Sequence, residues 1–267
     1  MQREVAAELE VDINAPTTLE FQIAVAPHPG ARVSESMSFV LDGQPIEPLE
    51  INGTHGNRIH KFDAGVGHLR VDYSATIVGY ADPAPVTEYD QSLYLRPSRY
   101  AESDKLFGFA GTEFGQFNNS ATLLERVSSW VGQRLLYVPG SSDPIDGAVD
   151  TMLAGAGVCR DYAHLVVALL RAVKVPARLV SVYAPGLYPM DFHAVAEAVV
   201  EGQWRVVDAT LLAPRDSLVR IATGRDAADT AFLDNHNGAI NLSWLSVSAI
   251  TDGILPSDSP AQLVSIH

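Results

Sequence analysis

The chain has 267 residues, of which 47% are hydrophobic and 19% are charged, a composition typical of soluble globular proteins rather than of disordered or fibrous ones. Its net charge of −14 argues against a nucleic-acid partner, because phosphate backbones need a basic surface. No apolar run approaches the roughly 18 residues that span a bilayer, and the first residues lack the apolar centre of a secretory signal. We therefore expect no membrane partner and a cytoplasmic location.

Residues 1–80 are predicted to form an all-β domain. Short segments with partial alternation of apolar and polar residues are separated by turn signals such as APHPGA, LDGQP and NGTHGN. The segments are EVAAELEVDI, LEFQIAV, VSESMSFVLD, RIHKFDAG and LRVDYSATIVGY. Their spacing predicts an antiparallel sandwich or barrel. The stretch 81–91 is rich in proline and acid and is predicted to be a linker.

Three helices are predicted after the linker. The first covers SATLLERVSSWVGQRL, where apolar residues recur at helical spacing and Ser120 is available as a cap. The second is expected to begin at Asp143 and to end before Gly155, with Val149, Met152 and Leu153 facing inward. The third begins at Cys159 and ends before Pro176; its broad apolar stripe predicts a central helix.

Beyond residue 178 the apolar period falls to two, in RLVSVY, HAVAEAVV, WRVVDAT and INLSWLSVSAI. This change predicts a β-sheet packed on the helices. The expected fold class is therefore α+β, with an all-β domain over 1–80 and a catalytic-type domain over 92–267.

Cys159 is the only cysteine in the chain, so it cannot form an internal disulfide. A helix N-terminus favours negative charge, and Gly155 and Gly157 leave the approach to the sulfur open, so the position suits a thiolate nucleophile. A helix terminus contributes only roughly 0.3–1 kcal/mol at exposed sites, whereas one pKa unit corresponds to about 1.36 kcal/mol. A cationic partner is therefore also required, and histidine is the usual one.

His193 is the candidate partner among eight histidines. His164 follows Cys159 by five positions and so lies about 140° further round the helix, pointing elsewhere. If the EGQ turn closes at Glu201–Gly202, Val195 lies opposite Asp208 on the next strand.

His193 shares a strand face with Val195, so its ring and the Asp208 carboxylate are expected to be diagonal neighbours, roughly 7–8 Å apart at the backbone. Asp208 can then hold one ring nitrogen and present the other to Cys159. Each residue also has an ordinary structural explanation: an inert buried thiol, a histidine at a strand end, and a turn aspartate.

The motifs around these residues resemble the bacterial transglutaminase-like superfamily of the cysteine-protease type. The family pattern runs G-x-C-x-D-x-A, then R-A-x-x-x-P-A-R, H-A-W-x-E and D-P-T; the chain has GVCRDYA, RAVKVPAR, HAVAE and DAT in that order. YLRPSRY, YVPGSSDPIDGA and TGRDAADTAFL look like the family's flanking segments, and residues 1–80 look like the β-rich N-terminal domain usually found with it.

The resemblance implies a papain-like core, in which a helix headed by cysteine packs on an antiparallel sheet that carries histidine and aspartate. Cys159 would be the nucleophile, His193 the general base and then acid, and Asp208 the orienting group. Two positions depart from the family pattern: the aromatic residue after His-Ala is Val195, and the proline of Asp-Pro-Thr is Ala209. Neither departure changes one of the three candidate residues, but because of both departures the sequence does not determine the substrate.

The expected reaction is thiol-dependent acyl transfer on the amide bond of a peptide or protein, without a cofactor. One oxyanion donor would be the Cys159 backbone N–H; Gln133 and Tyr137 are candidates for the second by position. Water as the acceptor gives a peptidase or amidase, which we favour, and an amine gives a transglutaminase. Oligomeric state and acyl donor are not determined by the sequence.

Two hypotheses of other classes compete with catalysis. Cys, His and Asp can bind zinc, but the sequence has one cysteine and no paired histidine motif, so no metal site is expected. A silent binding module on the same fold is kept open by Val195 and Ala209.

Five further residues are assigned structural roles. Asp161 and His164 are expected to pack or support, Arg178 to pair with a carboxylate, and Trp204 and Trp244 to lie in the core.

Overall fold

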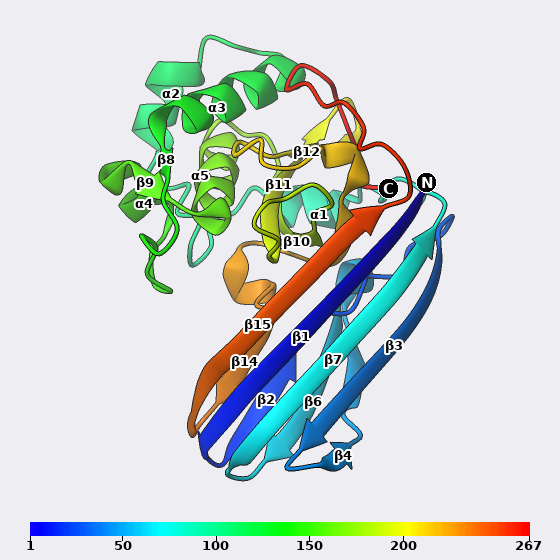
Figure 1. Cartoon of the computed structure of the whole chain (residues 1–267). Coiled ribbons are helices and arrows are strands. Elements are labelled where there is room, and N and C mark those ends of the chain that lie inside the picture. Colours follow the sequence, from blue (N-terminus) through cyan, green and yellow to red (C-terminus); the bar gives the residue numbers. More distant parts are fainter.

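The computed structural model describes residues 1–267, and Figure 1 shows two connected bodies. The first, low in the view, is a sandwich of long strands; the second, above it, combines helices with a smaller sheet. The predicted α+β class is confirmed.

Two antiparallel sheets form the sandwich. The first has the order β15-β1-β7-β3-β4 and the second the order β14-β2-β6-β5. The strands of the first sheet are β15 (Ala239–Thr251), β1 (Gln2–Ala15), β7 (Gly67–Val78), β3 (Arg32–Leu41) and β4 (Gln44–Ile46). Those of the second are β14 (Leu233–His236), β2 (Thr17–Phe21), β6 (Arg58–Ala64) and β5 (Leu49–Asn52).

Alternation of side chains builds the sandwich core. Along β1, Val5, Leu9 and Val11 are buried, while the acidic residues between them point outward. Successive residues of a strand face opposite sides, so this pattern leaves one apolar face to pack on the second sheet. All five segments predicted as strands in residues 1–80 form strands.

The last two strands correct the expected layout. INLSWLSVSAI forms most of β15, which pairs with β1, and β14 pairs with β2. Residues 233–251 therefore complete the sandwich, although the sequence analysis placed them with the second domain. Period-two alternation identifies a strand, but the partner sheet depends on contacts with residues far away in the chain. The division of the chain near 81–91 stays a prediction.

The second body contains five helices, one of which is buried among the others. They are α1 (Glu88–Leu93), α2 (Phe107–Phe114), α3 (Ser120–Arg134), α4 (Ala148–Ala154) and α5 (Cys159–Ala172). Every residue of α5 from Asp161 to Ala172 is buried. It packs on the sheet and contacts α2, α3 and α4, as Figure 1 shows by its place in the middle of this body. Most residues of α5 are apolar, and its buried polar residues Asp161, His164 and Arg171 each make hydrogen bonds, as a helix covered on all sides requires.

The sheet beneath α5 is antiparallel with the order β12-β11-β10-β13. Its strands are β13 (Val219–Gly224), β10 (Ala177–Tyr183), β11 (His193–Val200) and β12 (Gln203–Val207). A short parallel pair, β8 (Leu136–Tyr137) and β9 (Ala156–Gly157), lies beside the start of α5. Three 3₁₀ turns complete the fold, at Thr54–Gly56, Arg215–Ser217 and Ala227–Asp229.

Some details of the helix predictions are wrong. The cap of α3 is Asn119, whose side chain accepts from the N–H groups of Ala121 and Thr122, and not Ser120. Helix α4 begins at Ala148 rather than at Asp143, because Asp143 and Asp146 bond to each other in a turn. Leu153, expected to face inward, is 80% exposed.

The predicted linker is partly ordered. Residues 81–87 have no regular element, but α1 begins at Glu88 with Thr87 as its cap. The carbonyl of Pro85 accepts a hydrogen bond from the Trp204 indole at 3.1 Å. This stretch is therefore attached to the sheet of the second body.

The two bodies share apolar and polar contacts. Tyr183, Val219 and Ile221 of the smaller sheet belong to the same buried cluster as the sandwich core. The Tyr183 hydroxyl also donates to the carbonyl of Ile23 at 2.8 Å. The sandwich is therefore packed directly against the sheet that carries His193. No helix of the structure is long and apolar enough to cross a membrane.

Candidate active site

Cys159 is the first residue of α5, and the turn before it is built to place it there. Gly155 ends α4 with a left-handed backbone (φ 65°), a conformation that favours glycine. A Cβ atom on Gly157 would lie 2.7 Å from the Cβ of Asp161, so only glycine fits at this position. The Val158 N–H donates to Asp161 Oδ2 at 2.8 Å and caps the helix. The half-buried thiol is thus held at a helix N-terminus.

His193 and Asp208 meet as the hairpin register predicts. Val200 pairs with Gln203 across a two-residue turn, and Ala196 pairs with Val207. Asp208 directly follows β12, and its Oδ2 accepts a hydrogen bond from His193 Nε2 at 2.7 Å. Both side chains are buried, at 0% and 2% exposure.

Asp208 is held in place from its other side. Its Oδ1 accepts from the Thr210 backbone N–H at 2.9 Å and from the Thr210 hydroxyl at 2.6 Å. Burial alone would raise the pKa of Asp208, but His193 and Thr210 outweigh it and lower that pKa. The carboxylate is therefore ionised at neutral pH and fixes the orientation of the imidazole.

The imidazole of His193 favours its charged form. Burial alone would lower its pKa, but Asp208 and then Cys159 outweigh this effect and raise the pKa of His193 above the usual range. Nδ1 has no hydrogen-bond partner, and Cys159 and His193 line the same pocket. One ring nitrogen, Nε2, is therefore bonded to the Asp208 carboxylate, and the other, Nδ1, is free.

The two oxyanion candidates lie in different surroundings. Tyr137 pairs with Gly157 in the β8–β9 ladder, two residues before Cys159. Burial raises the pKa of Tyr137 to about 12; the Cys159 side chain adds to this shift, and the Cys159 backbone N–H opposes it. Neither side chain lines the pocket, and Gln133 is exposed on α3 and makes no hydrogen bond to Cys159, His193 or Asp208. Only Tyr137 is thus placed beside the thiol.

Asp161 caps α5 and also holds the turn that positions the thiol, whereas Asp150 only caps α4. Replacing each aspartate by alanine therefore separates the two roles. Asp161→Ala is expected to destabilise the chain by about 1 kcal/mol and also to lower the rate of Cys159 alkylation by iodoacetamide, because the turn that holds the sulfur loses its anchor. In α4, Asp150 accepts from the Gly147 N–H at 3.0 Å in the same way. Asp150→Ala should therefore lower the melting temperature without changing the alkylation rate. Equal rates for the two variants would contradict this role of Asp161.

Four of the five residues assigned structural roles have them as expected, beginning with Asp161 and His164. Besides capping α5, Asp161 accepts from the Ser142 hydroxyl at 2.9 Å. His164 is fully buried, stacks on Tyr100 and accepts from the Ala227 N–H at 3.1 Å. Burial lowers the pKa of His164 to about 3, so it is neutral.

Arg178 and the two tryptophans complete this set. Arg178 is fully buried, pairs with Glu197 at 2.7 Å and lies 3.8 Å from the centre of the Trp204 ring. Trp204 is 2% exposed and lies in the core as predicted, but Trp244 is 55% exposed, so that prediction is wrong. Trp244 pairs with Glu10 on the outer face of the sandwich.

A pocket of about 660 Å³ opens beside Cys159 and His193. This is within the usual size range for ligand sites, roughly 300–1,000 Å³. Its walls come from both bodies, and more than half of its lining residues are apolar. Sequence analysis missed Phe192, Phe232 and Leu245 in this wall. Phe192 could have been found because it directly precedes His193, whereas Leu245 belongs to the strand assigned to the wrong sheet and Phe232 directly precedes β14.

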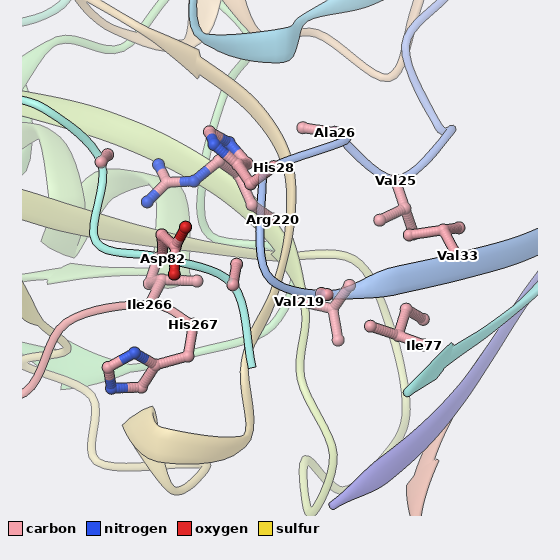
Figure 2. A pocket seen from close by; sticks show the side chains of 13 residues that line it. Val25, Ala26, His28, Val33, Ile77, Asp82, Val219, Arg220, Ile266 and His267 are labelled. Carbon is pink, nitrogen blue, oxygen red and sulfur yellow. The ribbon is translucent and has the colours of Figure 1, made fainter. Parts of the chain in front are cut away.

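A second hollow lies away from the thiol, between the sandwich and the chain end. Figure 2 shows His28 and Arg220 together at one side of it, with Val25, Val33 and Ile77 at the other. Its volume of about 20 Å³ has room for about one water molecule. A substrate therefore cannot enter there, and the pocket beside Cys159 is the candidate site. The structure contains no group of three or more His, Cys, Asp or Glu side chains placed to hold a metal ion.

Comparisons with known proteins agree with this fold. Residues 113–209 match the family model of the transglutaminase-like superfamily. A solved structure from Cytophaga hutchinsonii, described as a "putative cysteine protease", is 33% identical and superposes with a TM-score of 0.89 over 98% of this chain and 96% of that chain. This likeness supports a cysteine-protease-like fold for nearly the whole chain.

Among curated proteins, an uncharacterized protein of Mycobacterium leprae (strain TN) is 24% identical over 159 residues. The match covers 55% of this chain and 55% of that protein, so it spans about half the length of the relative.

Proposed function

Because the chain belongs to the transglutaminase-like superfamily, we propose that it is an enzyme that cleaves amide bonds of peptides or proteins through Cys159, His193 and Asp208. The observation that carries this proposal is the buried His193–Asp208 hydrogen bond of 2.7 Å in a pocket that also contains the thiol of Cys159. The carboxylate sets the imidazole tautomer, and the free ring nitrogen exchanges a proton with the sulfur. No cofactor enters the reaction.

In the first half of the reaction, the Cys159 thiolate attacks the amide carbonyl carbon. A C–S bond forms, and the carbonyl π electrons move to the oxygen. His193 Nδ1 then gives its proton to the leaving nitrogen as the C–N bond breaks, which leaves a thioester. In the second half, His193 takes a proton from water, whose oxygen displaces the sulfur and releases a carboxylic acid.

The developing oxyanion needs donors beside the sulfur. The Cys159 backbone N–H lies at the start of α5 and is a suitable first donor. We assign the second role to the Tyr137 hydroxyl, which remains protonated at neutral pH because its pKa is raised to about 12. Gln133 is not favoured, since it makes no hydrogen bond to Cys159, whereas Tyr137 adjoins the Cys159 side chain and backbone N–H.

Water is proposed as the acceptor. The Cytophaga hutchinsonii structure, which matches over nearly the whole chain, bears a protease description, and this supports hydrolysis over amine transfer. A cytoplasmic location stays a prediction from the sequence.

Incubation with casein, with and without dansylcadaverine, tests the proposal. The wild-type chain should generate new amino termini in casein, and Cys159→Ala should generate none. If the amine labels casein in a Cys159-dependent reaction without cleavage, the acceptor is an amine and not water. Absence of both reactions would contradict catalysis and favour a binding module.

A further inference from the structure

We propose that the edge of the β-sandwich supplies an apolar subsite that selects a bulky apolar side chain of the substrate next to Cys159. The inference rests on the proposed function and specifies its substrate class. It also gives the sandwich a direct part in recognition.

The subsite is formed where the sandwich meets the sheet that carries His193. Phe192 directly precedes His193, and its ring stacks on Phe232 at 5.0 Å between centroids. Phe232, Leu233 and Leu245 come from the chain leading into β14, from β14 itself and from β15. All four side chains pack against the sandwich core and also line the pocket of Cys159.

These side chains are only half buried, although they adjoin one of the two large apolar clusters of the chain. Their remaining apolar surface faces the pocket of about 660 Å³ that contains the thiol. A substrate side chain that covers this surface removes it from water, which is favourable for aliphatic and aromatic groups. Lysine and glutamate side chains would be desolvated there without compensation.

The charged residues of the pocket do not change the expected preference for apolar side chains. Arg160 is held through Nη2, which donates to the Ser142 hydroxyl at 2.6 Å and to the carbonyl of Asp143 at 2.7 Å, while its Nε is buried without a hydrogen-bond partner. Asp191 accepts from the Phe192 N–H at 2.7 Å, and both Asp191 and Asp234 are exposed. The apolar wall is therefore the part of the pocket that can discriminate among side chains.

Matched peptidyl chloromethyl ketones test the subsite without requiring turnover. The reagents are N-acetyl dipeptides in which Phe, Leu, Ala, Lys or Glu stands either next to the ketone or one residue before it. The rate of Cys159 alkylation is measured by mass spectrometry and divided by the rate with iodoacetamide, which has no side chain. At one of the two positions, Phe and Leu should react about 10-fold faster than Ala, Lys and Glu, or more.

Three variants locate the preference. Phe232→Ala and Leu245→Ala should each bring the ratio of the Phe to the Ala reagent closer to one, and Trp244→Ala, next to Leu245 but on the outer face, should leave it unchanged. Equal ketone rates at both positions, or a preference for Lys, in a protein that reacts with iodoacetamide would overturn the subsite alone. If neither kind of reagent reacts at Cys159, the proposed function fails and the subsite with it.

Discussion

His193→Ala is expected to lower the rate of amide hydrolysis by about 10⁴-fold or more, the range seen when one member of such a group is removed. The imidazole interacts with both other residues of the group: Asp208 and Cys159 raise its pKa, and it lowers the pKa of Asp208. Without it, the sulfur loses its proton acceptor and the leaving amine loses its proton donor. Release of new amino termini from casein measures the effect.

A matched control separates chemistry from general loss of structure. His68 is exposed on β7 and bonds to Asp12 at 2.8 Å, far along the chain from the site. His68→Ala should retain the wild-type rate. The prediction fails if His193→Ala remains folded, by circular dichroism, and still cleaves casein within about 10-fold of the wild-type rate.

Glu197→Gln is expected to destabilise the chain by about 3–5 kcal/mol, the range for breaking a buried ion pair by removing one partner. Glu197 is 1% exposed and accepts from two buried guanidinium groups, Arg178 at 2.8 Å and Arg220 at 2.6 Å. Glutamine keeps the shape but leaves both charges without a counter-ion. Urea unfolding near neutral pH should show a large fall in the midpoint.

The same residue predicts a pH dependence. Burial raises the pKa of Glu197, but Arg220 and Arg178 outweigh it and lower the pKa to about 2 from a usual value of 4.5. A lowered carboxyl pKa stabilises the folded chain above the unfolded value, and this contribution is lost as the pH falls through the folded value. The Gln variant should therefore lose less additional stability than the wild type between these two pH values.

An exposed pair supplies the comparison for both measurements. Glu50 bonds to Arg58 at 3.2 Å but is 40% exposed, so Glu50→Gln should change the free energy of unfolding by less than about 1 kcal/mol. If Glu197→Gln unfolds at the same urea concentration as Glu50→Gln, the buried cluster does not stabilise the fold.

The contact between His193 and Asp208 could be predicted because it is local. A two-residue turn at Glu201–Gly202 fixes the register of a hairpin, and the alternation of side chains then fixes the shared face. The position of Cys159 followed in the same way from a glycine-rich turn and a helical apolar stripe. The geometry of the core of the site was thus contained in short stretches of sequence.

The far wall of the pocket could not be predicted in this way. β15 pairs with β1 across more than 200 residues, and no local pattern records that partnership. Alternation in INLSWLSVSAI shows that the strand has two faces, but not which face is covered. For this reason Trp244 was assigned to the core and the neighbouring Leu245 was overlooked, although Leu245 is the residue that lines the pocket.

The rate of Cys159 alkylation by iodoacetamide as a function of pH, compared between the wild-type chain and His193→Ala, tests most directly that thiol, imidazole and carboxylate act as one unit. We predict that the wild type is alkylated readily well below pH 7 and that the variant loses this low-pH reactivity and reacts only as the solution becomes alkaline. Superimposable profiles would contradict the account, because they would show that the sulfur is not influenced by the ring beside it.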